Sequence, residues 1–204
     1  MQLQLSFIDL PCELIGQSAM GGQSSNLDKF QDYFTINKTG STLDVKQTVP
    51  YWSENRPSLS GILFQKYTVA INLNDYASLG IDEVLISTAA HLTLQGLNVP
   101  RLSVHANPAG VDISRSQFRE LDLRGGACSF TLSNVAVANS VNIDIHSASV
   151  NWKPTPHELT LELKQVSGSV TCGGKRMDAP HTYRRGSGSP RVVVNCIGGS
   201  VNLG

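Results

Sequence analysis

Short runs in which apolar and polar residues alternate recur along this chain at a nearly constant step. Over residues 81–204 the runs come in pairs. The first runs of the six pairs are Val84/Ile86, Leu102/Val104, Leu121/Leu123, Val141/Ile143, Leu159/Leu161 and Val192/Val194. The second runs are Leu92/Leu94, Val111/Ile113, Phe130/Leu132, Ala148/Val150, Val170/Cys172 and Val201/Leu203. Strict alternation is typical of β-strands that bury one face, and a fixed longer period indicates stacked repeats.

This pattern predicts an all-β fold, namely a single-domain parallel β-helix (solenoid) with about 18–20 residues per rung. Within the domain, residues 1–80 are expected to form an irregular N-terminal β portion that starts or caps the stack. Residues 81–204 are expected to form the regular rungs, interrupted by an insertion at residues 173–191. Stacking the rungs in register is expected to bring Val104, Leu123, Ile143 and Leu161 into one inward column.

The first 80 residues predict shorter elements. Leu3, Leu5 and Phe7 alternate as a strand does, and Leu14 with Ile15 indicates a second, shorter strand. Residues 34–36 and 43–45 flank the turn sequence at 37–41, which predicts a β-hairpin. Residues 67–73 read as a strand, residues 27–33 as one helical turn at most, and residues 16–26 and 50–60 as loops.

The charge of the chain limits its partners. Sixteen basic and sixteen acidic residues leave a formal net charge of zero. Binding to nucleic acid or to a membrane surface requires a dominant positive field, so neither is predicted. No apolar run approaches the ~18 residues of a membrane-spanning helix, and residues 1–10 lack the pattern of a signal peptide. The protein is therefore expected to be either cytoplasmic or a trimmed ectodomain, and the sequence leaves both alternatives open.

Neither the cysteines nor the histidines indicate a metal site. Cys12, Cys128, Cys172 and Cys196 form no CxxC pair, and the five histidines form no HxxxH or HxH pattern. The cysteines read as buried and reduced, with a disulfide between Cys172 and Cys196 left open. G-x-S-x-G, P-loop and G-x-G-x-x-G motifs are absent. No metal and no cofactor is predicted.

The insertion at 173–191 holds the one local excess of charge. Its basic residues, set against Asp178 alone, are Lys175, Arg176, Arg184, Arg185 and Arg191. A loop with this charge could hold an anionic polymer or a lipid headgroup, and a solvated loop without a ligand is the alternative. These five residues are the candidate binding site.

Outward carboxylates give an alternative site. Register predicts an outer column of His105, Arg124, Asp144 and Glu162, in which Asp144 and Glu162 lie on neighbouring rungs. Two carboxyl groups about 5–5.5 Å apart are the arrangement of a retaining glycosidase. Catalysis also needs a cleft and, for sugars, aromatic side chains to stack on, and aromatics make up only 6% of the chain. A solvated ladder is the favoured interpretation, and no enzymatic activity is predicted.

Four features together resemble a known family: the strand at 66–73, the alternating rungs, the hairpin at 34–45 and the closing segment at 191–203. They resemble the bacterial putative-adhesin family of β-strand-repeat domains, whose function is unknown. The resemblance covers most of the chain. It implies a β-solenoid with no established enzymatic activity, no functional residues to carry over, and a membrane-tethered protein that faces outward.

The expected function is therefore non-enzymatic binding or scaffolding at the cell surface by an extracytoplasmic, adhesin-like module, membrane-anchored in the full-length protein. Its expected partner is an anionic polymer, a glycan or an envelope component, and not a nucleic acid. The alternative is a carbohydrate-binding or carbohydrate-active β-helix protein that uses the outward carboxylates. Because Gly204 follows an apolar strand by one residue, a bare end of the stack is expected to pair with a second copy as an end-to-end homodimer.

Overall fold

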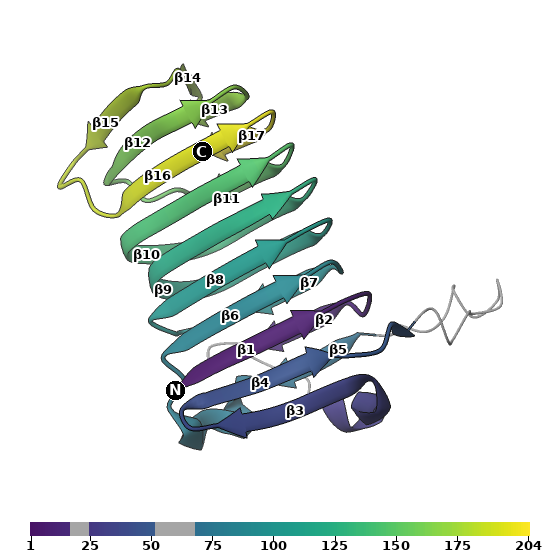
Figure 1. The fold of residues 1–204 in the computed structure, drawn as a ribbon. Coiled ribbons are helices and arrows are strands. Elements are labelled where there is room, and N and C mark those ends of the chain that lie inside the picture. The colour runs from purple at the N-terminus through teal and green to yellow at the C-terminus, as the bar shows by residue number, and fades with distance from the viewer. Residues whose placement is uncertain (17–24, 52–67) are drawn as a thin grey trace.

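The computed structural model describes residues 1–16, 25–51 and 68–204. In this part of the chain the strands form a single 17-stranded mixed sheet that is not closed on itself. Figure 1 shows the strands stacked one beyond another along the molecule, with a short helix at the N-terminal end of the stack. The prediction of an all-β chain is confirmed.

The elements are short apart from two long strands, β9 and β10. In the first half they are β1 (Gln2–Phe7), β2 (Cys12–Ile15), the 3-10 helix η1 (Leu27–Tyr33), β3 (Phe34–Thr39), β4 (Thr42–Gln47), β5 (Val69–Asn72), the 3-10 helix η2 (Leu73–Leu79), β6 (Glu83–Thr88), β7 (Leu92–Gln95) and β8 (Arg101–Ala106). They continue as β9 (Gly110–Gly126), β10 (Ser129–His146), β11 (Ser149–Lys153), β12 (Leu159–Val166), β13 (Ser169–Cys172), β14 (Lys175–Met177), β15 (His181–Arg185), β16 (Arg191–Ile197) and β17 (Ser200–Leu203).

Pairing divides the strands into two rows. The first row runs β3, β4, β1, β6, β8, β9, β10, β16, β12, β15. The second row runs β5, β2, β7, β9, β10, β11, β17, β13, β14. The long strands β9 and β10 contribute to both rows. Among the described strands, antiparallel pairing is confined to β3, β14 and β15 at the ends of the rows.

The apolar runs form the core as predicted. All twelve apolar runs of the repeat are buried, and their residues join the apolar residues of β1, β2 and β4 in one hydrophobic cluster. The hairpin of β3 and β4 is confirmed. Residues 27–33 form the seven-residue 3-10 helix η1, which is longer than the single helical turn that was expected. The strand expected at 67–73 is β5, and Leu73 begins η2 instead. Residue 67 and most of the two expected loops lie outside the described residues.

Two strand pairs occupy places in the stack that their places in the chain did not predict. β1 and β2 lie between β4/β5 and β6/β7, so the first strands are not the outermost. β16 and β17 lie between β10/β11 and β12/β13, because the insertion carries the chain back past β12 and β13. The strand before Gly204 therefore does not lie at the end of the stack, and the end-to-end homodimer stays a prediction. Figure 1 shows the C-terminus inside the stack, with β13, β14 and β15 beyond it.

The inserted β16 also changes the predicted columns. Val104, Leu123 and Ile143 are in register as expected. Ile143 then faces Val194 of β16, which in turn faces Leu163. The placement of Leu161 in this column was wrong by one rung and by two residues along the strand. Parallel backbone hydrogen bonds carry no information on residue identity, so equivalent apolar pairs can exchange places.

The corners between the rows depend on residues with a left-handed backbone. One corner is formed by Gly96, Arg115 and Asn134, whose φ angles are 66°, 49° and 56°. Each of the three directly follows a residue of one register column, which consists of Gln95, Ser114 and Ser133. Ala127 and Ser147 repeat this conformation at another corner, with φ angles of 49° and 51°. Side chains other than glycine disfavour this region by about 1–2 kcal/mol. Packing between the stacked strands therefore holds these residues in a left-handed backbone conformation that they disfavour in isolation.

All four cysteines are free and buried in the core, so the disulfide between Cys172 and Cys196 does not form. Burial raises the pKa of the Cys12, Cys128, Cys172 and Cys196 thiols, Cys12 most strongly. A neutral thiol behaves as a small apolar side chain and is a poor nucleophile. Within the described residues, no helix is long and apolar enough to span a membrane.

Candidate functional site

Two adjoining pockets lie along the first row of strands. The first has a volume of about 490 Å³ and is lined by Met1, Gln2, Ser41, Asp82, Glu83, Pro100, Arg101, Arg119, Glu120 and Asn139. The second, of about 430 Å³, includes Ser103, Asp122, Arg124 and Asn142. Glu83, Arg101 and Glu120 line both. We call the two pockets together the polar groove.

Register places the side chains of the polar groove. Gln2, Glu83, Arg101 and Glu120 face one another in order on β1, β6, β8 and β9. The residue after each of the last three is a buried apolar one, so alternation turns these charged side chains outward. Neighbouring strands are about 4.8 Å apart. The groove therefore presents a column of polar groups at a fixed repeat.

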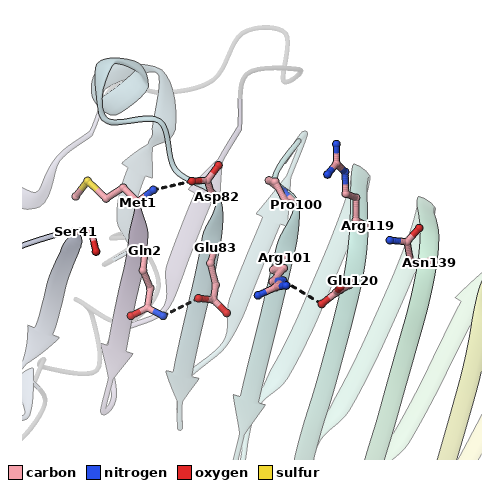
Figure 2. Close-up of a pocket in the computed structure, with 10 residues that line it drawn as sticks. All are labelled: Met1, Gln2, Ser41, Asp82, Glu83, Pro100, Arg101, Arg119, Glu120 and Asn139. Carbon is pink, nitrogen blue, oxygen red and sulfur yellow. Dashed lines mark hydrogen bonds and ion pairs between the residues drawn. The ribbon is translucent and has the colours of Figure 1, made fainter.

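Neighbouring strands neutralise most of the charges in the first pocket. The Gln2 amide Nε2 donates to Glu83 Oε2 at 2.7 Å. Arg101 Nε lies 3.1 Å from Glu120 Oε2, and the Met1 amine lies 2.9 Å from Asp82 Oδ2. Figure 2 shows these three pairs on consecutive strands. The groove is thus made of groups that hold one another in place.

Asp122 is the centre of the second pocket. It accepts hydrogen bonds from Asn142 Nδ2 at 2.8 Å and from Ser103 Oγ at 3.4 Å, on the two neighbouring strands. Arg124 Nη2 lies 2.8 Å from Asp122 Oδ2. The hydrogen bond to Asp122, followed by the Coulombic attraction, raises the pKa of the Arg124 guanidinium above its usual value. The carboxylate is saturated with donors, as suits a rigid hydrogen-bonding surface rather than a reactive group.

One edge of the first pocket follows a corner of the chain. This edge consists of Asp82, Pro100, Arg119 and Asn139. Each of them stands immediately before a strand residue, and these strand residues (Glu83, Arg101, Glu120 and Ser140) are in register with one another. Figure 2 shows Arg119 between Pro100 and Asn139, with its guanidinium directed away from Glu120. The Arg119 side chain is exposed, and it makes no hydrogen bond or ion pair with any described residue, although the Arg119 backbone N–H donates to the Pro100 carbonyl. It is the one free cation of this pocket.

The basic residues of the insertion do not lie in the polar groove. Lys175 and Arg176 are on β14 and Arg184 and Arg185 on β15, the last strands of the two rows. Arg191 begins β16. The insertion therefore covers the end of the stack.

Four of these five side chains are bound by their own chain. Arg191 Nη2 lies 2.5 Å from Glu162 Oε2, and Arg176 Nε lies 3.5 Å from Asp178 Oδ1. Arg184 donates to the Ser187 carbonyl at 2.6 Å, and Arg185 to the Pro156 carbonyl at 2.5 Å. Lys175 is exposed. Binding of an anionic partner by these residues stays a prediction.

The two carboxylates of the alternative site are not on neighbouring strands. Asp144 faces Asn195 of β16, whereas Glu162 faces Val193, one column away. The Asn195 amide donates to Asp144 at 2.7 Å. The hydrogen bond from Arg191 lowers the pKa of the Glu162 carboxyl. The expected pair of adjacent carboxyl groups was wrong, because the sequence did not show that β16 enters between their strands.

The part of the chain that the structure describes has no candidate metal-binding site. No group of three histidine, cysteine, aspartate or glutamate side chains is placed to hold an ion there. His91 and His146 each lie near one carboxylate, at 3.3 Å from Asp112 and 3.9 Å from Asp144. Both are exposed surface pairs.

Sequence reasoning missed the polar groove, although a signal for it exists. Glu83, Arg101 and Glu120 each stand immediately before the first apolar run of a rung. Aligning the rungs at their own period therefore places the three charges in one column. The contribution of Gln2 could not be seen in this way, because the position of β1 beside β6 is set by the fold.

Comparisons with known proteins do not place this chain in a family. No protein-family model matches the chain, and no curated protein matches it. A crystal structure of a "putative cell adhesion protein" from Clostridium sporogenes is similar over 98% of this chain and 90% of its own, with 12% identity and a TM-score of 0.47. A likeness this distant shows neither a common fold nor a common function.

Proposed function

We propose that this protein is a β-solenoid that works outside the cytoplasm as a non-enzymatic binding module, and that the polar groove is its ligand-binding surface. In the solenoid, each rung contributes one strand to each row. The ligand is a glycan of the cell envelope or of a surface that the cell adheres to.

The observation that carries this proposal is the pairing of polar side chains across the strands of the groove. Arg101 with Glu120, Gln2 with Glu83, and Asn142 with Asp122 are each held across two strands. Such groups cost little to order when a ligand binds, because the fold has already ordered them. Carboxylate, amide and guanidinium groups at fixed spacing can both donate to and accept from the hydroxyl groups of a saccharide.

Glu162 of the alternative carboxylate site is one of three described carboxyl groups with a displaced pKa, and its pKa is lowered rather than raised. Hydrogen bonds lower the pKa of Asp75, Glu158 and Glu162. A glycosidase needs one carboxyl group whose pKa is raised, so that it can donate a proton at neutral pH. A carbohydrate-active enzyme built on Asp144 and Glu162 is not supported, because β16 separates their strands.

The site of action is proposed from the family resemblance. Members of the putative-adhesin family are commonly tethered to a membrane and face outward, so we propose the same for the full-length protein. The test is protease accessibility of the protein on intact cells. Digestion only after lysis would contradict an extracytoplasmic role.

A panel of immobilised glycans tests the binding function. We expect at least one glycan to bind, and Arg101→Ala to weaken this binding by removing the partner of Glu120. Arg115→Ala is the matched control, because Arg115 is an exposed arginine that does not line the groove. Reducing ends released from the same glycans are measured in parallel. Glycan cleavage that Asp144→Asn abolishes would show that the protein is an enzyme and would overturn the proposal. Equal glycan binding by Arg101→Ala and Arg115→Ala would show that the polar groove is not the binding surface.

A further inference from the structure

Arg119 differs from the other arginines of the described chain. Six of these are already held by a carboxylate or a carbonyl oxygen of the protein, namely Arg101, Arg124, Arg176, Arg184, Arg185 and Arg191. The side chains of Arg119 and Arg115 make no such contact, and Arg119 alone of the two lines the polar groove. The groove therefore has one guanidinium whose hydrogen-bond donors remain available.

The surroundings of Arg119 keep it available. Its neighbours along the corner are Pro100, which has no side-chain acceptor, and Asn139. The nearest acidic residue in sequence, Glu120, is paired with Arg101. Asp82, on the far side of Pro100, is paired with the Met1 amine. The carboxylates of this pocket that could have neutralised Arg119 are thus engaged elsewhere.

We propose that Arg119 binds the carboxylate of an acidic sugar, and that the ligand of the polar groove is a uronic-acid-containing glycan. This inference rests on the proposed function. A guanidinium and a carboxylate are both planar and form two parallel hydrogen bonds. Asn139, Gln2 and Ser41 line the same pocket and can bond the hydroxyl groups of the sugar ring.

The charge of the pocket favours a single carboxylate over a densely charged anion. Glu83 is held by the neutral Gln2 amide rather than by a cation, so it keeps its negative charge exposed to the ligand. A polysulfated chain would place many charges near Glu83 and Glu120, and like charges repel. One carboxylate per sugar satisfies Arg119 and leaves the remaining contacts to hydroxyl groups.

The experiment compares two polymers that differ in the carboxyl group alone. Polygalacturonate fragments and the same fragments with their carboxyl groups reduced to alcohols are titrated onto the immobilised full chain. We expect the carboxylated fragment to bind about tenfold more tightly, as one charge-assisted contact implies. Arg119→Gln abolishes this difference, whereas Arg115→Gln leaves it intact. Equal affinity of the wild type for the two polymers, or an unchanged difference in Arg119→Gln, overturns the inference.

A third polymer separates specific recognition from general attraction to anions. Dextran sulfate is expected to bind more weakly than polygalacturonate, and tighter binding of dextran sulfate contradicts the assignment of a carboxylated sugar. If the reduced fragment binds as well as the acidic one and Arg101→Ala weakens both, the polar groove stands and the role of Arg119 fails. If no glycan of either kind binds in the groove, the proposed function fails with it.

Discussion

Gly168 lies so close to Gly199 that a Cβ atom on Gly168 would be 2.0 Å from the Gly199 carbonyl oxygen. Gly199 lies equally close to Ala148, because a Cβ atom on Gly199 would be 2.1 Å from the Ala148 carbonyl oxygen. The backbone approaches itself here because the corner of one rung rests on the corner of the next. These two glycines are needed for their lack of a side chain rather than for an unusual φ angle.

Gly168→Ala is expected to destabilise the protein by about 1–3 kcal/mol, because the obstacle is backbone and cannot rotate away. Urea denaturation followed by circular dichroism measures the change. Gly126→Ala is the control, since its nearest heavy atom would be 3.6 Å away. Equal stability of the two variants would contradict the close approach.

Gln47 is a buried polar residue that links the end of β4 to the β1–β2 turn. It is 1% exposed, and its Oε1 accepts hydrogen bonds from the backbone N–H groups of Ile8, Asp9 and Leu10. Its Nε2 donates to Asp9 and to the Val49 carbonyl. Gln47→Ala leaves these groups without their partner. We expect a loss of about 2–4 kcal/mol in the free energy of unfolding.

Gln117→Ala is the matched control for Gln47, because Gln117 is exposed and its loss is expected to change stability by less than about 0.5 kcal/mol. Chemical denaturation of both variants gives the comparison. Similar losses in the two would show that Gln47 does not hold the β1–β2 turn.

The pair formed by Glu162 and Arg191 makes stability depend on pH. The hydrogen bond from Arg191 lowers the pKa of the folded Glu162 carboxyl below its unfolded value. The stabilisation is therefore fully present above the unfolded pKa of about 4.3 and is lost as the pH falls through the folded pKa. Arg191→Gln is expected to be less stable than the wild type at neutral pH and to approach it in acid.

Denaturation at a series of pH values checks this expectation, and Arg115→Gln serves as a control with no carboxylate partner. In parallel, the Glu162 side chain is expected to titrate at higher pH in Arg191→Gln when it is followed by nuclear magnetic resonance. A stability difference that stays constant between neutral pH and acid would rule out this pair as its cause.

Charged residues on the last strand of the second row protect the end of the stack. β14 is three residues long and carries Lys175 and Arg176, both exposed. Short, charged edge strands discourage pairing with another chain. Replacing both residues with threonine is expected to produce association that increases with concentration, measured by light scattering. The same replacement at Lys29 and Arg115 removes equal charge and is expected to leave the mass unchanged. Association of the wild type through this end would contradict this role for the two charges.

Most of the strands could be predicted from the sequence, because burial of one face imposes alternation on each of them. Leu121 and Leu123, or Val192 and Val194, mark a strand whatever lies beside it. The hairpin at 34–45 was equally visible, since its turn needs particular residues. The corners at Arg115 and Ala127 could not be predicted from the sequence, because neither arginine nor alanine is typical of a left-handed backbone.

By itself, the sequence determined most of the strands, the core residues and the period of the repeat, because alternation with a period of two marks the buried face of each strand. Only the tertiary structure decided the order of the strands in the sheet. β1 enters beside β6 and β16 enters beside β10, and backbone hydrogen bonds permit either order. That order separates Asp144 from Glu162, extends the column of Glu83 to Gln2, and assigns the basic insertion to the end of the stack. The polar groove follows from strand neighbours, and neighbours are a property of the fold.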